Sequence, residues 1–254
     1  MAEPFHCDFA KRLFMSHLGN HLINAADFHS NDRGFGMLYL NTIHKTWVLS
    51  RLAIELDEMP QAYDRFQVET WVESAMRFFT NRNFRISNSE KVFGYGRSVW
   101  AMIDTETRQP ADLFAVNEGA LMSYVVGADG SAEGVECPIA KPSRVKMTDG
   151  ARLERVVKTT YSDIDMNGHV NSIKYIEHAL DLWDAEWYAH HPLRRLDIAY
   201  VAEAHLGDEL CLFLEETGDH SATDGQQKFA VSIAKRGSSD EKPIETCRCE
   251  VVFG

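Results

Sequence analysis

The stretch Ser50–Leu56, SRLAIEL, returns at an offset of 144 residues as Arg194–Val201, RRLDIAYV. Each copy leads into a second strand-like segment, DRFQVETWV at 64–72 and DELCLFLEE at 208–216, with the alternation typical of half-buried strands. The positions that match are Leu52, Ile54, Asp64 and Val68, which recur as Leu196, Ile198, Asp208 and Leu212. Self-similarity at a fixed offset indicates two halves that fold alike.

A helical pattern precedes the strand pair in both halves, because apolar residues fall at spacings near three and four. They are Phe9, Leu13, Leu18, Leu22 and Ile23 in the first half, and Val170, Ile173, Ile176, Ala179, Leu180 and Trp183 in the second. Each half then ends in strand-rich sequence, VFGYGRSVWAMID at 92–104 and KFAVSIAKR with CRCEVVFG at 228–236 and 247–254. We therefore expect an α+β fold in which a helix and an antiparallel sheet occur twice.

The boundary between the halves is predicted within residues 126–150, which hold four glycines and two prolines and few periodic apolar residues. We expect a first domain over 1–135, a linker over 136–150 and a second domain over 151–254. Within this region and just beyond, basic residues gather in an otherwise acidic chain. Lys141, Arg144, Lys146, Arg152, Arg155 and Lys158 face only Asp149 and Glu154.

The overall composition disfavours several classes of protein. The 254 residues hold 26 Lys and Arg against 38 Asp and Glu, a net charge of −12 that repels nucleic acid and anionic lipid. No stretch approaches the ~20 apolar residues of a membrane span, and the start MAEPFHCDFAKRLF lacks a signal-peptide core. We expect a cytoplasmic protein. Five scattered cysteines without a C-x-x-C pair indicate neither a disulfide framework nor a zinc site.

The densest polar cluster is Tyr161–Asn171, YSDIDMNGHVN, between a strand-like run and the second helix. A calcium loop would use Asp163, Asp165 and Asn167, but the twelfth position, where a bidentate Glu is needed, is Lys174. A structural alternative is that Asp165 or Asn167 caps the helix. A catalytic alternative is that a carboxylate, an amide and the His169 imidazole surround a helix N-terminus, which could activate water and stabilise an oxyanion.

The run Asp165-Met166-Asn167-Gly168-His169-Val170-Asn171, followed by Lys174-Tyr175-Ile176, resembles the active-site segment of acyl-acyl carrier protein (acyl-ACP) thioesterases. Trp47–Arg51 and Val68–Val72 are similar to strands of that family's first domain, so the resemblance covers most of residues 10–215. It implies a double hot-dog fold, in which each of two tandem antiparallel sheets wraps around a long helix.

The resemblance also implies a set of catalytic residues: Asp165, Asn167, His169 and Glu203, the last in the setting Tyr200-Val201-Ala202-Glu203. The family often has Cys directly after that Glu, but here the residue is Ala204, so a Cys-His mechanism cannot operate. At the 144-residue offset Glu203 corresponds to Met59, and no D-x-N-x-H run precedes the first helix. The second half is therefore expected to be catalytic and the first to bind the acyl chain, with Met37, Leu38 and Leu40 as candidate pocket residues.

The expected activity is hydrolysis of acyl-ACP to release a free fatty acid, with no cofactor and no metal. In this scheme Glu203 and His169 activate a water, Asp165 orients His169 or the water, and Asn167 with helix N-terminal N–H groups holds the oxyanion. Direct attack by Asp165 or Glu203, giving an acyl-enzyme anhydride, is an alternative. An acyl-CoA thioesterase and a non-catalytic acyl-binding protein are alternative functions.

The expected partner is acyl carrier protein, which is acidic, and the candidate docking surface is the basic stretch from Lys141 to Lys158, with Lys174, Arg194 and Arg195. No nucleic acid and no membrane span are expected. The protein is expected to be a monomer or a homodimer.

Overall fold

The computed structural model describes residues 1–126, 136–142, 145–148, 150–218, 225–237 and 242–254. The first half contains helix α1 (Met15–Asn31) and strands β1 (Lys45–Leu56), β2 (Gln67–Ala75), β3 (Phe79–Ser87) and β4 (Val92–Asp104), with the short helix α2 (Met37–Leu40) and a 3₁₀ segment, η3 (Leu113–Tyr124), nearby. The second half contains β5 (Arg152–Lys158), α3 (Ser172–Leu180), α4 (Ala185–His190), β6 (Leu193–Tyr200), β7 (Glu209–Glu216), β8 (Gln227–Lys235) and β9 (Ile244–Phe253).

The strands form one antiparallel sheet of nine strands in the order β2-β3-β4-β1-β6-β9-β8-β7-β5. The two copies of the repeated stretch meet at its centre, since Leu52 pairs with Ile198 and Ile54 with Leu196. Each of these strands would otherwise leave a row of unpaired backbone N–H and C=O groups at a sheet edge. The α+β double hot-dog fold is confirmed, and its two sheets join through β1 and β6.

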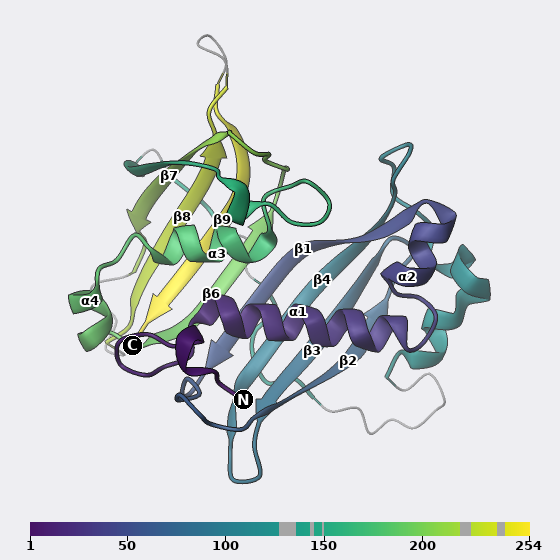
Figure 1. Ribbon diagram of the computed structural model, residues 1–254, viewed down its shortest axis with the longest axis horizontal. Helices are drawn as coiled ribbons and strands as arrows, with labels where there is room; N and C mark the ends of the chain where they lie inside the picture. The colour runs from purple at the N-terminus through teal and green to yellow at the C-terminus, as the bar shows by residue number, and fades with distance from the viewer. Residues whose placement is uncertain (127–135, 143–144, 149, 219–224, 238–241) are drawn as a thin grey trace.

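Helix α1 lies across one face of β1–β4, and α3 lies across the same face of the second set of strands (Figure 1). Gly19 of α1 lies at the contact between the helices, where a Cβ would be 3.3 Å from Ile173 Cδ1. One apolar core crosses the centre of the sheet and includes Leu22 of α1, Ile54 and Ile198 of the paired strands, and Ile176 of α3. The two halves therefore share their interior.

The second helix is shorter than its apolar pattern predicts. It starts at Ser172 because the Asn171 side chain accepts the Ile173 N–H at 2.9 Å. The cap is thus Asn171, and the expectation that Asp165 or Asn167 caps this helix is wrong. Val170 precedes the helix and Trp183 follows it, although both belong to the apolar pattern.

Part of the predicted linker crosses the face of the sheet opposite to the helices. Arg97 donates to Cys137 O at 2.6 Å, and Arg195 donates to Ala140 O at 3.2 Å. We call residues 136–142 the strap. The domain boundary at 135 lies outside the described residues and stays a prediction, as do the limits of the linker.

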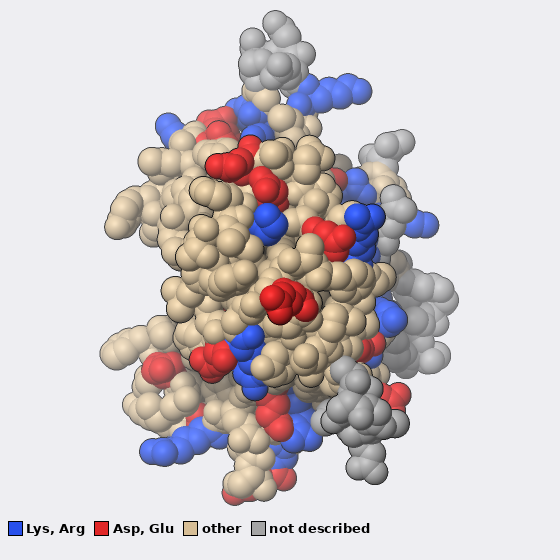
Figure 2. Space-filling view, turned by 90° about the vertical axis from the view of Figure 1, so that its right-hand side faces the viewer, with Lys and Arg blue, Asp and Glu red and all other residues tan. Residues whose placement is uncertain are grey.

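Charged side chains of both signs lie on the face of the molecule drawn in Figure 2. Figure 2 shows the side of the molecule that lies to the right in Figure 1, and among its described residues blue and red side chains are interspersed over a mostly uncharged surface. The described part of the chain contains no helix that is long and apolar enough to cross a membrane.

Candidate active site

The segment that contains Asp165, Asn167 and His169 forms a tight turn before α3. Asp165 Oδ1 accepts the backbone N–H of Asn167 at 2.8 Å and of His169 at 3.2 Å. The Asp165 N–H donates in turn to His169 O at 2.9 Å, and Gly168 adopts a φ of +81°. The carboxylate therefore fixes the backbone on which the imidazole is carried, and it contacts the amide of His169 instead of its ring.

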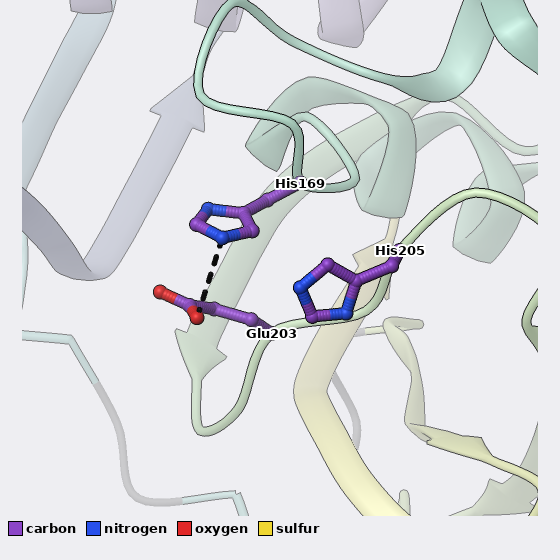
Figure 3. A group of neighbouring side chains, drawn as sticks. All are labelled: His169, Glu203 and His205. Atoms are coloured by element: carbon purple, nitrogen blue, oxygen red, sulfur yellow. Dashed lines mark ion pairs between the residues drawn. The ribbon is translucent and has the colours of Figure 1, made fainter.

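Glu203 lies in the loop that follows β6, and backbone contacts hold this loop against the turn. Val170 N–H donates to Ala204 O at 2.8 Å, and Lys235 Nζ donates to Glu203 O at 3.1 Å. As a result His169 Nε2 lies 3.5 Å from Glu203 Oε2 (Figure 3). Two residues that are 34 positions apart in the sequence thus form an ion pair when the histidine is protonated.

Arg108 of the first half is a second basic partner of Glu203. Its Nη2 lies 2.5 Å from Glu203 Oε1, so the two carboxylate oxygens face two different basic side chains, Arg108 and His169. Arg108 has a φ of +60° in the loop after β4, and its N–H donates to Asp104 O. Burial acts to raise the pKa of Glu203, but the Arg108 hydrogen bond and the charge of His169 outweigh it, so the pKa is lowered. Glu203 is ionised at neutral pH.

All four predicted residues line one cleft of about 520 Å³ at the junction of the two halves. The first half contributes Trp47, Val48 and Arg108 to its wall, and the second half adds Tyr175 and Tyr200. The exposed Asn167 side chain forms no hydrogen bond with another described residue, which leaves its amide available to a ligand in the cleft. The α3 N-terminus reaches the same cleft at Ser172.

One group of side chains in the described part of the chain has metal-ligand character: His169, Glu203 and His205, whose ligand atoms lie within 4.8 Å of one another. The two imidazole rings contact edge to face at 5.1 Å (Figure 3). Nitrogen and carboxylate ligands suit zinc. The Arg108 guanidinium on Glu203 disfavours a cation there, because it already neutralises the carboxylate.

Comparison with known proteins identifies the family. The model of the acyl-ACP thioesterase N-terminal domain matches residues 4–116, and the model of the C-terminal domain matches residues 147–246. The chain belongs to the acyl-ACP thioesterase family. The resemblance predicted from the D-x-N-x-H run is therefore confirmed. The turn lies in the stretch that matches the family's C-terminal domain, and the cleft is lined by residues from both matched stretches.

Relatives and solved structures agree with this membership. The chain is 48% identical to the structure of an acyl-ACP thioesterase from Bacteroides thetaiotaomicron, with a TM-score of 0.86 over 100% of this chain and 95% of that one. It is 29% identical to a palmitoyl-acyl carrier protein thioesterase of Gossypium hirsutum, over 73% of this chain and 46% of the relative. It is 27% identical to oleoyl-acyl carrier protein thioesterase 1 of Arabidopsis thaliana, over 82% of this chain and 58% of the relative. The chain spans about half the length of these two chloroplastic relatives.

Met59, the position in the first half that corresponds to Glu203 at the 144-residue offset, lies in a second cleft, of about 350 Å³. Met59 lines this second cleft and Glu203 lines the first. Leu193 lines the second cleft, and Leu49, which is 144 residues earlier, lines the first. The two clefts are thus related by the repeat, while a thioether replaces the carboxylate in one of them.

Residues predicted for the acyl chain and for docking have mixed outcomes. Met37 lines a cavity of the first half, whereas Leu38 is exposed and Leu40 is buried in the core. Arg195 pairs with Glu55 and Asp197, so its charge is compensated within the chain, and its place in a docking surface stays a prediction. Lys174 pairs with Glu177 at 2.6 Å, while Arg144 and Asp149 lie outside the described residues.

Sequence reasoning missed Arg108 and His205. Arg108 lies in an ordinary loop 95 residues from Glu203, and no spacing or motif links the two. His205 had a weak signal, since it lies two residues after the predicted Glu203 and so shares its loop.

Proposed function

We propose that this protein hydrolyses acyl-ACP and releases a free fatty acid. The observation that carries the proposal is the pair of His169 Nε2 and Glu203 Oε2 at 3.5 Å, in a cleft that also presents Asn167. Membership of the family supplies the thioester as the substrate class. The test is a panel assay of the purified protein on acyl-ACPs of several chain lengths, with Glu203→Gln as the inactive control.

In the proposed mechanism His169 and Glu203 activate a water that attacks the thioester carbonyl. The ionised Glu203 carboxylate holds His169 and stabilises the positive charge that the imidazole gains as it takes a proton from the water. When the tetrahedral intermediate collapses, the C–S bond breaks and His169 returns the proton to the departing thiolate of the carrier, which leaves the free fatty acid. The Asn167 amide and the Ser172 N–H at the start of α3 face the developing oxyanion, because Asn171 already accepts the N–H groups of Ile173 and Lys174. Asp165 is a positioning residue in this scheme, since its carboxylate accepts two backbone N–H groups of the turn.

The alternative of direct attack by Glu203 is less well supported, because Arg108 and His169 occupy both of its oxygens and lower its nucleophilicity. Asp165 is disfavoured for the same reason, since its Oδ1 accepts two amides. Single-turnover hydrolysis in ¹⁸O-labelled water separates the two schemes. Label is expected only in the fatty acid, and label in an enzyme carboxylate would overturn water attack.

We propose that the acyl chain extends from the cleft into the first half. Trp47 lines both the cleft and a cavity of about 90 Å³ between α1 and the sheet, so the two spaces share a wall. Met37 and Phe35 line the inner cavity. Replacing Met37 by Trp is expected to shift the preferred chain toward shorter acyl groups, and an unchanged chain-length profile would contradict this placement.

The proposed carrier is ACP, with CoA as the alternative. The docking surface is reduced to Lys141, Lys146, Arg152, Arg155 and Lys158, all exposed in the structure. The last three lie on β5, the outermost strand next to β7, and Arg152 is 3.6 Å from Glu154. An exposed basic strand attracts an acidic partner through a field that salt screens.

The docking test reverses the charge of Arg152, Arg155 and Lys158 together. We expect KM for acyl-ACP to rise at low salt and KM for an acyl-pantetheine to stay constant, because only the protein carrier reaches β5. Reversal of Arg85, which pairs with Glu69 on the first half, serves as the control. An unchanged KM for acyl-ACP would remove β5 from the interface. The cytoplasmic location and the monomeric or homodimeric state stay predictions.

A further inference from the structure

The cavity between α1 and the strands of the first half has an apolar wall with one polar side. Ile23, Phe35, Met37, Trp47 and Trp100 supply apolar surface. Asp27, Ser30, Thr80 and Arg82 line the same space. An unsubstituted hydrocarbon chain would form no hydrogen bond with these polar groups, so such a ligand does not account for them.

Arg82 is the most unusual of them. It lies on β3 opposite Ser98 of β4, on the face that packs against α1, and only 4% of its surface is exposed. Its guanidinium donates to Thr70 Oγ1 at 3.2 Å, to Ser30 Oγ at 3.2 Å and to His29 Nδ1 at 3.3 Å. Burial, with the charges of Arg82 and Arg33, lowers the pKa of His29 to about 4, so this imidazole is a neutral acceptor.

Within the described part of the chain, Arg82 forms no ion pair with a carboxylate. Asp27 lines the cavity without pairing with it. Other arginines with little exposure behave differently: Arg97 pairs with Glu73 at 2.9 Å, and Arg195 pairs with Glu55 and Asp197. Burial lowers the pKa of Arg82 to about 10, which still leaves it charged at neutral pH. A buried charge is costly unless it is paired, and a guanidinium has more N–H donors than the three used here.

We propose that this cavity selects acyl chains that carry a hydrogen-bond-accepting oxygen, a hydroxyl or a carboxylate, away from the thioester, and that Arg82 donates to that oxygen. The inference rests on the proposed function, since it names the acyl group that the cleft would process. A site built to hydrogen-bond a polar group rejects an analogue that lacks it, because the buried partner is then left unsatisfied.

The fold sets how far along the chain this oxygen lies. Arg82 is on β3, which is separated from β1 by β4, so it lies two strand spacings, ~10 Å, from the strand that carries Trp47. The oxygen therefore belongs to the distal part of the acyl chain. An oxygen adjacent to the thioester would stay in the cleft beside His169.

The decisive measurement is binding of non-hydrolysable ligands to the wild-type chain by calorimetry. The probes are S-alkyl pantetheine thioethers of equal carbon number that end in a methyl, a hydroxyl or a carboxylate. We expect the hydroxyl or the carboxylate probe to bind at least about 10-fold tighter than the methyl probe, the gain typical of a hydrogen bond to a charged group. Whichever of the hydroxyl and carboxylate probes binds more tightly identifies the kind of oxygen that Arg82 recognises. Equal binding of all three probes would overturn the inference.

Two variants connect the preference to Arg82. Arg82→Met should reduce the ratio between probes to about one, and Arg82→Lys should retain part of it. Arg97→Met is the matched control, because it removes another arginine of little exposure on the neighbouring strand without touching this cavity. An unchanged ratio in a folded Arg82→Met protein would overturn the assignment; if that variant does not fold, the wild-type comparison and Arg82→Lys still decide.

Assays of acyl-ACP hydrolysis distinguish a failure of this inference from a failure of the proposed function. If no acyl-ACP is hydrolysed while the oxygenated probes bind tighter, the proposed hydrolase activity fails and the ligand preference stands. If acyl-ACPs are hydrolysed with the same kcat/KM for methyl-ended and oxygenated chains, the preference fails and the activity stands.

Discussion

Replacing Arg108 by Met removes the guanidinium that lies 2.5 Å from Glu203 Oε1. The side chains are 53% and 40% exposed, so solvent screening reduces the ion pair to about 0.2–1 kcal/mol. Losing this stabilisation of the carboxylate should raise the pKa of Glu203, and at ~1.36 kcal/mol per pH unit a pH profile governed by this group should move by less than one unit. Arg108 lowers the pKa of Glu203, and its removal therefore means that a higher pH is needed to ionise the carboxylate.

The assay is the pH dependence of kcat/KM for an acyl-ACP, whose most acidic limb reports protonation of the Glu203 carboxylate that supports the His169 base. We expect this limb to move to higher pH by a few tenths of a unit in Arg108→Met, with a smaller shift between wild type and variant at high salt. Arg85→Met is the matched control, because Arg85 also lies 2.5 Å from a carboxylate, that of Glu69, outside the cleft. A limb that stays in place, or moves to lower pH, would refute the proposed coupling of Arg108 to Glu203.

Three further predictions concern the turn and the pair. Glu203→Gln and His169→Ala should each lower kcat by at least ~10² with the circular dichroism spectrum unchanged, and near-wild-type turnover would exclude that residue from the mechanism. Asp165→Ala should destabilise the fold by about 0.5–2 kcal/mol, because two backbone N–H groups of the turn lose their acceptor, and it should also lower kcat. Asp165→Asn should recover part of both. A stable and fully active Asp165→Ala protein would show that the turn does not need the carboxylate. Dialysis against a chelator should leave kcat/KM unchanged, because the proposed steps use only side chains and water; activity lost on dialysis and restored by zinc would place a metal on His169 and Glu203.

The sheet was predictable because its pattern repeats. Leu52 and Ile54 recur as Leu196 and Ile198, and apolar alternation in both stretches follows from burial on one face of a strand. That the two stretches pair with each other was not predictable, because identical alternation is compatible with two separate sheets. The pairing depends on which strand edges meet in space.

The candidate site was predictable where it is local or carried by the family motif. Asp165, Asn167 and His169 are close in sequence, and the resemblance supplied Glu203. The helix cap was mispredicted because Asn171 competes for the same role and only the backbone decides between them. Arg108 was beyond reach, since its contact with Glu203 requires the two halves to be packed together. The ion pairs of Arg195 were also beyond reach, because a positive charge in sequence does not reveal the carboxylates beside it in space.

The pairing of β1 with β6 within a single polypeptide has a consequence for how the two clefts can differ. In an assembly of identical subunits, any substitution in one cleft appears in its mate as well. Here the mates are encoded separately, so Met59 can stand in one where Glu203 stands in the other. Arg108 of the first half can likewise contact Glu203 of the second half, and no corresponding contact is required in the other cleft. Because both halves are encoded in one chain, the residues of one cleft can change without the same change appearing in the other.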